Sequence, residues 1–227
     1  MKKTVYGIFA LGAMAAFVWA PFRIFYEAPI QKTVLFFNQK IFYYHVPCAS
    51  MLFLAVIICG VASFGFLKTR KGVYDDVALA AGDCSILFGA ITLLTGMIWA
   101  KPAWNVWWQW DARLTMSLLL WMTMVGYVLV RRYGGLGAER LAAGLAFLGS
   151  VNVPLVYFSV KIWRTFHPPT STVPNLPTSM AKVFGFCMLT FLVFFVLLLI
   201  LRTKIAENKR RIYACNEQGL DLSLIHI

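Results

Sequence analysis

The 227-residue sequence is poor in charged side chains, and acidic residues are especially scarce. Only 13% of its residues are charged, and nine acidic residues stand against 21 basic ones. Hydrophobic residues make up 60% of the chain, and the mean hydropathy is +0.73. Since soluble domains carry about 25% charged residues, this composition excludes an ordinary soluble protein. It predicts that lipid surrounds most of the chain.

Several sequence motifs are also missing. The five cysteines form neither CxxC nor CxxCH, so a disulfide framework, a thioredoxin-like site and covalent c-type haem attachment are unsupported. The phosphate-binding pattern GxxxxGK[ST] does not occur, which gives no support to nucleotide hydrolysis by this chain. The basic residues form no contiguous stripe, so the net charge of +12 is weak evidence for nucleic-acid binding.

Long apolar runs recur along the chain, at residues 4–22, 46–67, 77–99, 114–130, 138–158 and 181–201. Each is close to the ~20 residues that a helix needs to cross ~30 Å of hydrocarbon. We therefore predict an all-α integral membrane protein with six transmembrane helices. Lys2 and Lys3 precede the first run as in a signal peptide, but no convincing small-residue cleavage site follows, so we expect this run to be retained.

Six spans place both termini on one side of the membrane, and the positive-inside bias indicates the cytoplasm. With both termini inside, 13 of the 21 basic residues lie in inside segments. We divide the chain into a membrane domain at 1–205, a cytoplasmic basic tail at 206–221 and a tail at 222–227. This last segment, "LSLIHI", reads like translated adapter DNA, and we expect it to be non-native.

The segment "KPAWNVWWQWDARLT", residues 101–115, holds four of the eight tryptophans. Single tryptophans near span ends usually form an interfacial belt, but a cluster of four is harder to explain in this way. If the segment is helical, Trp104, Trp107, Trp108 and Asp111 share one face of a short amphipathic helix on the outer surface. Such a face, with Trp110 beside it, would offer a broad aromatic platform.

Two histidines lie in the other connections that the topology places on the outer side, His45 in "FYYHVPCAS" and His167 in "WRTFHPPTS". Each is close to a proline, Pro47 or Pro168, which fixes the local backbone direction and limits helix continuation. A lone histidine at a span boundary is more often an interfacial polar residue, but two facing one cleft can clamp a metal. Tetrahedral zinc requires more ligands than this face offers, whereas haem iron needs two axial ligands.

The charges of the outer connections suit the same ligand. Eight basic residues stand there against Glu27 and Asp111, and cationic side chains attract the two propionates of haem. Lys101 and Arg113, which flank the tryptophan cluster, are the preferred candidates, although contact with phospholipid headgroups explains single basic residues equally well. Asp111 also stands where an N-cap would begin the fourth span, and both roles can coexist.

At these residues the chain resembles the haem-handling membrane proteins of cytochrome c biogenesis, and among them the family of cytochrome c maturation protein C. "WNVWWQWDARLT" resembles the tryptophan-rich (WWD) signature of that family, with WWxWDxRLT intact from Trp107 to Thr115. "YYHVP" and "FHPP" stand where the family has its two outer histidines, and the six-span pattern covers about residues 1–205. The chain departs from the family at Asn105, where a glycine is usual, and we expect this residue to alter the bend of the loop.

The resemblance implies a protein of the bacterial inner membrane that binds haem b transiently at its periplasmic face. It implies axial ligation by His45 and His167, with the tryptophan motif cradling the ring. The family presents haem to a periplasmic haem chaperone and works beside an ABC-type ATPase, its membrane partner and a small single-span subunit. This chain would then be a binding and transfer subunit, not an enzyme.

Two other classes stay open. A membrane b-type cytochrome would normally hold haem between histidines inside its apolar runs, and none of the three histidines lies mid-span. A small-molecule permease would carry polar residues near mid-membrane, and Asp83 is the one candidate, which we expect to be interfacial or paired with a neighbouring helix. Gly82, Gly89 and Gly96, spaced every seven residues in that span, are expected to mark close helix packing.

Overall fold

The computed structural model describes residues 2–30, 36–135 and 137–217, and within them it contains six α-helices. By length and composition, six helices can cross a membrane, which confirms the predicted all-α membrane protein with six spans. Short π and 3-10 helices lie at Arg23–Glu27, Phe36–Ile41 and Thr170–Thr172. The α-helices are α1 (Lys2–Phe22), α2 (Phe42–Thr69), α3 (Gly72–Trp104), α4 (Ala112–Tyr133), α5 (Ala138–Ile162) and α6 (Thr178–Glu217).

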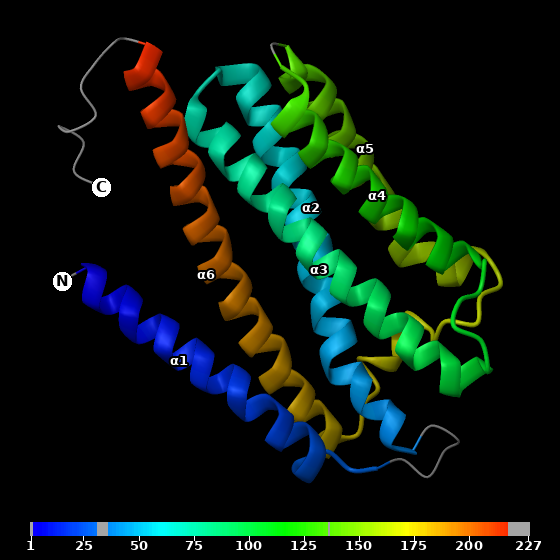
Figure 1. Ribbon diagram of the computed structural model, residues 1–227. Helices are drawn as coiled ribbons and strands as arrows, with labels where there is room; N and C mark the ends of the chain where they lie inside the picture. Colours follow the sequence, from blue (N-terminus) through cyan, green and yellow to red (C-terminus); the bar gives the residue numbers. More distant parts are fainter. Residues whose placement is uncertain (1, 31–35, 136, 218–227) are drawn as a thin grey trace.

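Helices α2 and α3 form the centre of the bundle (Figure 1). The pair α4 and α5 packs on one side of them, and α6 packs on the other side with α1 outside it. Consecutive helices run in opposite directions, so the start of α2, the end of α3 and the connection between α5 and α6 meet at one end of the bundle (Figure 1). We call this the histidine end, because both His45 and His167 lie there.

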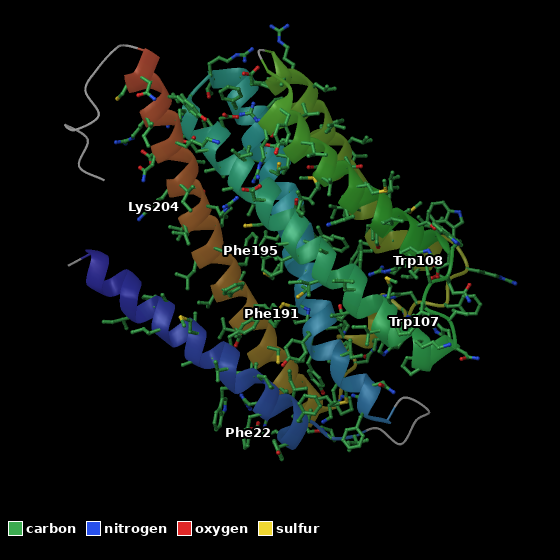
Figure 2. All side chains as sticks on the ribbon, viewed as in Figure 1. Phe22, Trp107, Trp108, Phe191, Phe195 and Lys204 are labelled. Carbon is green, nitrogen blue, oxygen red and sulfur yellow. The ribbon has the colours of Figure 1, made fainter. Side chains whose placement is uncertain are left out.

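The core contains small and flexible apolar side chains from α2 to α6, among them Val56, Leu120 and Met124. Phe191 and Phe195 extend it from α6 (Figure 2). Small residues allow the helix backbones to approach closely, which lipid-embedded helices use because their association lacks a hydrophobic driving force. Cys48, Cys59, Cys84 and Cys187 are buried as free thiols, as expected for small apolar side chains.

The three regularly spaced glycines of α3 confirm the packing interpretation. A Cβ atom on Gly82 would lie 2.5 Å from the ring of Tyr127, and one on Gly89 would lie 2.4 Å from the ring of Trp121. A Cβ atom on Gly96 would lie 3.2 Å from Cε1 of His45. The glycine stripe therefore makes room for two aromatic rings of α4 and for one histidine of α2.

Ion pairs join the helices at the end of the bundle opposite the histidine end. Asp75 pairs with Arg131 of α4 at 2.5 Å, and Asp76 pairs with Arg210 of α6 at 2.7 Å. Asp83 accepts from two guanidinium groups, those of Arg132 on α4, at 2.6 Å, and Arg202 on α6. The expectation that Asp83 is paired with a neighbouring helix is thereby confirmed.

Two boundaries differ from the sequence prediction. His45 lies within α2, which begins at Phe42 and runs through Pro47 without interruption. Pro47 lies in the second turn of α2, beyond the first turn where proline removes no helical hydrogen bond. Proline in membrane helices is accommodated by neighbouring groups that satisfy the freed carbonyl. Helix α6 continues without a break to Glu217, so residues 206–217 extend the last span as helix. The tail at 222–227 lies outside the described residues.

Candidate functional site

The structure brings the two predicted histidines together. The ring centroids of His45 and His167 are 6.5 Å apart, and the ring planes are inclined by 39°. His45 comes from the first two turns of α2, and His167 comes from the irregular segment that follows α5. Residues 122 positions apart in the chain thus lie close together at one end of the bundle, as the topology argument requires.

The hydrogen bonds of both rings determine which nitrogen is free. The Thr95 hydroxyl donates to the carbonyl of Ile91 at 2.7 Å, so it accepts from Nδ1–H of His45, 3.0 Å away. The Nδ1–H group of His167 donates to the carbonyl oxygen of Pro168 at 2.8 Å. Because Nδ1 carries the proton in both rings, Nε2 keeps its lone pair in both, which is the form that binds a metal.

The environment of His167 keeps its ring neutral. Burial and, to a smaller extent, the guanidinium charge of Arg113 lower the pKa of His167 to about 4, while the bond to Pro168 acts in the opposite direction. A protonated imidazole has no lone pair for a metal. His167 is therefore in its ligating form at neutral pH.

The spacing of the rings fits one metal ion between them. Two imidazoles bound on opposite sides of an ion, with metal–nitrogen bonds of about 2.0 Å and a ring radius of about 1.1 Å, place their centroids about 6.3 Å apart. The observed 6.5 Å agrees with this value. Within residues 2–30, 36–135 and 137–217, no three His, Cys, Asp or Glu side chains gather as a metal-binding group. The histidines thus suit an ion whose other ligands come from outside the chain, as in haem.

The tryptophan motif lies beside the histidines, but it does not form the expected short helix. Helix α3 ends at Trp104, and Asn105 adopts a left-handed conformation with φ of 62°, after which the chain is irregular up to Asp111. Asparagine tolerates this conformation better than other non-glycine residues. Position 105 therefore favours glycine or asparagine. Because residue 105 is left-handed, α3 ends before Trp107 and Trp108.

Without the helix, the tryptophans do not share one face. Trp104 packs edge-on against Trp99 at 5.2 Å and lies 6.0 Å from Phe166 of the His167 segment. Trp108 packs edge-on against Trp110 at 5.8 Å. Trp107 and Trp110 expose 55% and 76% of their surface, although both are large apolar side chains. Figure 2 shows Trp107 and Trp108 at the connection between α3 and α4.

Trp108 carries a polar group without a partner. Its indole nitrogen Nε1 is buried and has no hydrogen-bond acceptor among the described residues. A buried N–H group without an acceptor costs about 1–3 kcal/mol, so its persistence suggests an acceptor that arrives with a ligand. The tryptophan motif therefore offers exposed aromatic surface and one unused donor.

Asp111 connects the tryptophan motif to the His167 segment. Its Oδ1 accepts from the backbone N–H of Leu114 at 2.9 Å, which makes it the N-cap of α4, as predicted. Its Oδ2 accepts from the hydroxyl of Thr165 and from the backbone N–H of Phe166, the latter at 3.1 Å. One carboxylate therefore begins a transmembrane helix and holds the segment that carries the second histidine.

The two predicted cations are engaged with backbone groups. Arg113 donates to the carbonyl oxygens of Val156 and Tyr157 near the end of α5, at 3.1 and 3.3 Å. Its charge still acts on His167, so it lies near the site. Lys101 donates to the carbonyl oxygen and to Oδ1 of Asn105, at 3.1 and 3.2 Å. Lys101 thus stabilises the end of α3, whereas Arg113 adds positive charge near the histidines.

Sequence reasoning missed three residues of the site: Thr95, Gly96 and Thr165. Thr95 fixes the tautomer of His45, and Gly96 leaves room for its ring. Thr165 accepts from the backbone N–H of His167 at 3.1 Å. A threonine–glycine pair in an apolar span was a weak signal for the first two, and no local signal distinguished Thr165 from the other threonines nearby.

Comparison with known proteins identifies the family. The family described as Heme exporter protein C matches residues 1–217. Heme exporter protein C of Bradyrhizobium diazoefficiens is 35% identical over 163 residues, which cover 71% of this chain and 62% of that protein. The protein of the same name from Paracoccus denitrificans is 32% identical over 182 residues, covering 77% and 76%.

A plant relative is similar over a shorter segment. The putative cytochrome c biosynthesis ccmC-like mitochondrial protein of Marchantia polymorpha is 37% identical over 134 residues, or 59% of this chain and 57% of that protein. This chain thus spans about three fifths of the length of these first relatives. On the match over residues 1–217, the chain belongs to the Heme exporter protein C family.

Proposed function

We propose that this chain binds haem at the periplasmic face of the bacterial inner membrane and delivers it to a periplasmic haem chaperone during cytochrome c maturation. His45 and His167 are the axial ligands of the iron. The chain acts as a binding and transfer subunit, and ATP hydrolysis belongs to partner chains. Both termini then lie in the cytoplasm, consistent with the distribution of basic residues.

The spacing of the two imidazoles carries this proposal. The centroids lie 6.5 Å apart, each Nδ1 is occupied by a hydrogen bond, and each Nε2 is therefore free. Haem would supply four equatorial ligands, which the described residues do not gather around the histidines, and would leave two axial positions for them. The ligand set also suits haem b, whose attachment needs no cysteine motif.

The tryptophan motif supplies surface for the macrocycle. Trp107 and Trp110 expose aromatic faces at the histidine end, and a porphyrin is a flat apolar partner for such faces. The Nε1–H group of Trp108 is an available donor for a propionate oxygen, and the guanidinium of Arg113 adds favourable charge. In this arrangement Lys101 acts through the end of α3, and Asp111 acts through the His167 segment.

The expected partners follow from the family. Relatives are named as heme exporters and as cytochrome c biosynthesis proteins. We propose that the chain works with an ABC-type ATPase, its membrane subunit and a small single-span subunit, beside the chaperone that receives haem. Transfer requires haem binding of moderate affinity, because a site that binds haem too tightly cannot release it to the chaperone.

An absorption spectrum of the detergent-purified protein, with and without added haem, tests the proposal. We expect the spectrum of a low-spin, bis-histidine haem, and we expect both His45→Ala and His167→Ala to abolish it. Asn175→Ala is a matched control, because Asn175 lies in the same connection and its described side-chain hydrogen bond goes to the carbonyl of Ser171. Retention of the bis-histidine spectrum in both histidine variants would refute the ligand assignment.

A second measurement separates delivery from the function of a resident b-type cytochrome. Loaded protein is mixed with an apo-protein that binds haem tightly, and haem transfer is followed by the change in absorption. A delivery protein loses its haem within the experiment. Retention of the haem over hours, together with reversible electron transfer, would favour the cytochrome.

A further inference from the structure

The ring of His45 is held between two transmembrane helices. It projects from α2, and its Nδ1–H group bonds to Thr95 of α3, 3.0 Å away. The hydroxyl of Thr95 is itself fixed by its bond to the carbonyl of Ile91. Gly96, the next residue of α3, lies against the same edge of the ring, where an added Cβ atom would lie 3.2 Å from Cε1 and 3.7 Å from Nδ1. Movement of His45 therefore requires movement of packed helices.

The ring of His167 is held by its own connection. Residues 163–169 form no helix, and the ring bonds to the carbonyl of the next residue, Pro168. The backbone N–H of His167 bonds to Thr165, two residues earlier, and Thr165 in turn donates to Asp111. Apart from the bond of the Trp163 backbone N–H to Ser159 at the end of α5, the described hydrogen bonds that tie residues 163–169 to the α-helices run through the Asp111 carboxylate. Irregular segments with few anchors open more easily than packed helices.

From this asymmetry we infer that His167 is the ligand that leaves the iron when haem is handed over, while His45 stays bound. Thr95 and Thr165 are positioning residues: Thr95 holds the permanent ligand, and Thr165 sets how readily the other ligand departs. This inference rests on the proposed haem-binding function. In the exchange, the bond from iron to Nε2 of His167 breaks, and the neutral imidazole keeps its electron pair. An incoming neutral donor then supplies a pair to iron, without a change in oxidation state.

Carbon monoxide is a suitable probe of this exchange, because it binds ferrous haem after one axial ligand has left. The full-length, haem-loaded protein is reduced with dithionite and mixed with carbon monoxide. Infrared spectroscopy then gives the C–O stretching frequency, which reports on the ligand that remains on the opposite side. Rapid mixing gives the binding rate, which reports on departure of the ligand that leaves.

The inference predicts different effects for two isosteric substitutions. Thr95→Val removes the acceptor for Nδ1–H of His45, which changes the basicity of that ring, and we expect the C–O frequency to shift. Thr165→Val removes an anchor of the His167 segment. We expect it to raise the binding rate about threefold to tenfold, the range for loss of one hydrogen bond, with the frequency unchanged.

Two further variants serve as controls. Thr95→Ser keeps the hydroxyl and should restore the frequency of the unaltered protein, which loss of packing alone would not do. Thr123→Val, at a half-buried threonine of α4 whose described hydrogen bond goes to the carbonyl of Leu119, should change neither quantity.

The possible results separate the inference from the function on which it rests. A frequency shift in Thr165→Val but not in Thr95→Val would mean that His45 leaves, and it would overturn the inference. An unchanged binding rate in Thr165→Val, or an unchanged frequency in Thr95→Val, would also overturn it. Absence of a bis-histidine spectrum in the unaltered protein would contradict the proposed function itself.

Discussion

The polar side chains at the two ends of the helical bundle differ in how they are paired. At the end opposite the histidines, Asp75, Asp76 and Asp83 of α3 each pair with arginine across a helix boundary. At the histidine end, each imidazole ring of His45 and His167 uses one of its two nitrogens: Nδ1 forms a hydrogen bond, and Nε2 keeps its lone pair for a ligand. At the first end the three carboxylates are paired within the chain, although Nε of Arg131 is buried without a partner among the described residues, whereas the second end leaves imidazole nitrogens for a ligand.

Polar groups that stabilise the bundle thus lie at one end, and polar groups that are available to a ligand lie at the other. Charges in a membrane protein are costly unless they are paired, and the pairs of α3 meet that requirement by joining α3 to α4 and α6. By contrast, Nε2 of His45, Nε2 of His167 and the buried Nε1 of Trp108 make no hydrogen bond within the part of the chain that the structure describes. Variants at the two ends should therefore separate stability from haem binding.

The largest effect on the ligand site is expected from Asp111→Ala. This change removes the acceptor for Leu114, Thr165 and Phe166 together. We expect haem affinity to fall about tenfold or more, and loss of the N-cap to lower the free energy of unfolding by about 1 kcal/mol. Titration of the purified variant with haem, followed by absorption, measures the first effect, and thermal unfolding measures the second.

Asp111→Asn separates these two roles. Asparagine is also a good N-cap, so the stability of α4 should be kept. Its carbonyl oxygen cannot serve the cap and both donors of the His167 segment as two carboxylate oxygens do. Haem affinity should therefore still fall, and an affinity equal to that of the unaltered protein would contradict the anchoring role.

The next effect is expected at the opposite end, from Asp83→Asn. The variant leaves Arg132 and Arg202 without the charge that they share. Both guanidinium groups are partly exposed, so solvent screening limits the loss, and we expect thermal stability to fall by about 1 kcal/mol. The haem spectrum and haem affinity should not change.

Asp76→Asn provides a matched comparison, since Asp76 pairs with a single arginine, Arg210. Its loss should destabilise the bundle less than the loss of Asp83. If either variant loses haem binding while still folded, the two ends are coupled, and the separation proposed above is wrong.

A smaller effect on the site is expected from Gly96→Ala. The added methyl group would lie 3.2 Å from Cε1 of His45, so the ring must shift by a few tenths of an ångström. We expect haem affinity to fall about threefold, because the spacing of the two rings already matches an iron between them. Gly185→Ala in α6, where an added Cβ atom meets nothing within 4 Å, is the control and should leave haem affinity unchanged.

The sequence predicted the number of transmembrane helices and which connections share a side of the membrane. The lengths of the apolar runs give the number of spans, and the order of the spans places every second connection on the same side. That reasoning predicts that His45, His167 and the tryptophan motif lie at one end of the bundle, as the structure shows. It did not predict that α2 begins before His45, because Pro47 suggested an interruption. It also did not predict the contacts of Thr95 and Thr165, since these depend on which helix faces lie together. Side-chain contacts across helices have no local sequence pattern.

The backbone angle φ of Asn105 determines the conformation of the tryptophan motif. Of the variants considered, Asn105→Gly should have the smallest effect on thermal stability and haem binding. The sequence suggested a short helix carrying Trp107 and Trp108, but the φ of 62° at Asn105 ends α3 before them. Glycine adopts this conformation without strain, so the path of the loop should be kept. The variant loses the bond from Lys101 to Oδ1, but the bond to the backbone oxygen stays. We expect thermal stability within about 0.5 kcal/mol and an unchanged haem spectrum. Asn105→Val, which disfavours positive φ, should instead lower both stability and haem affinity, and equal behaviour of the two variants would show that this angle does not shape the site.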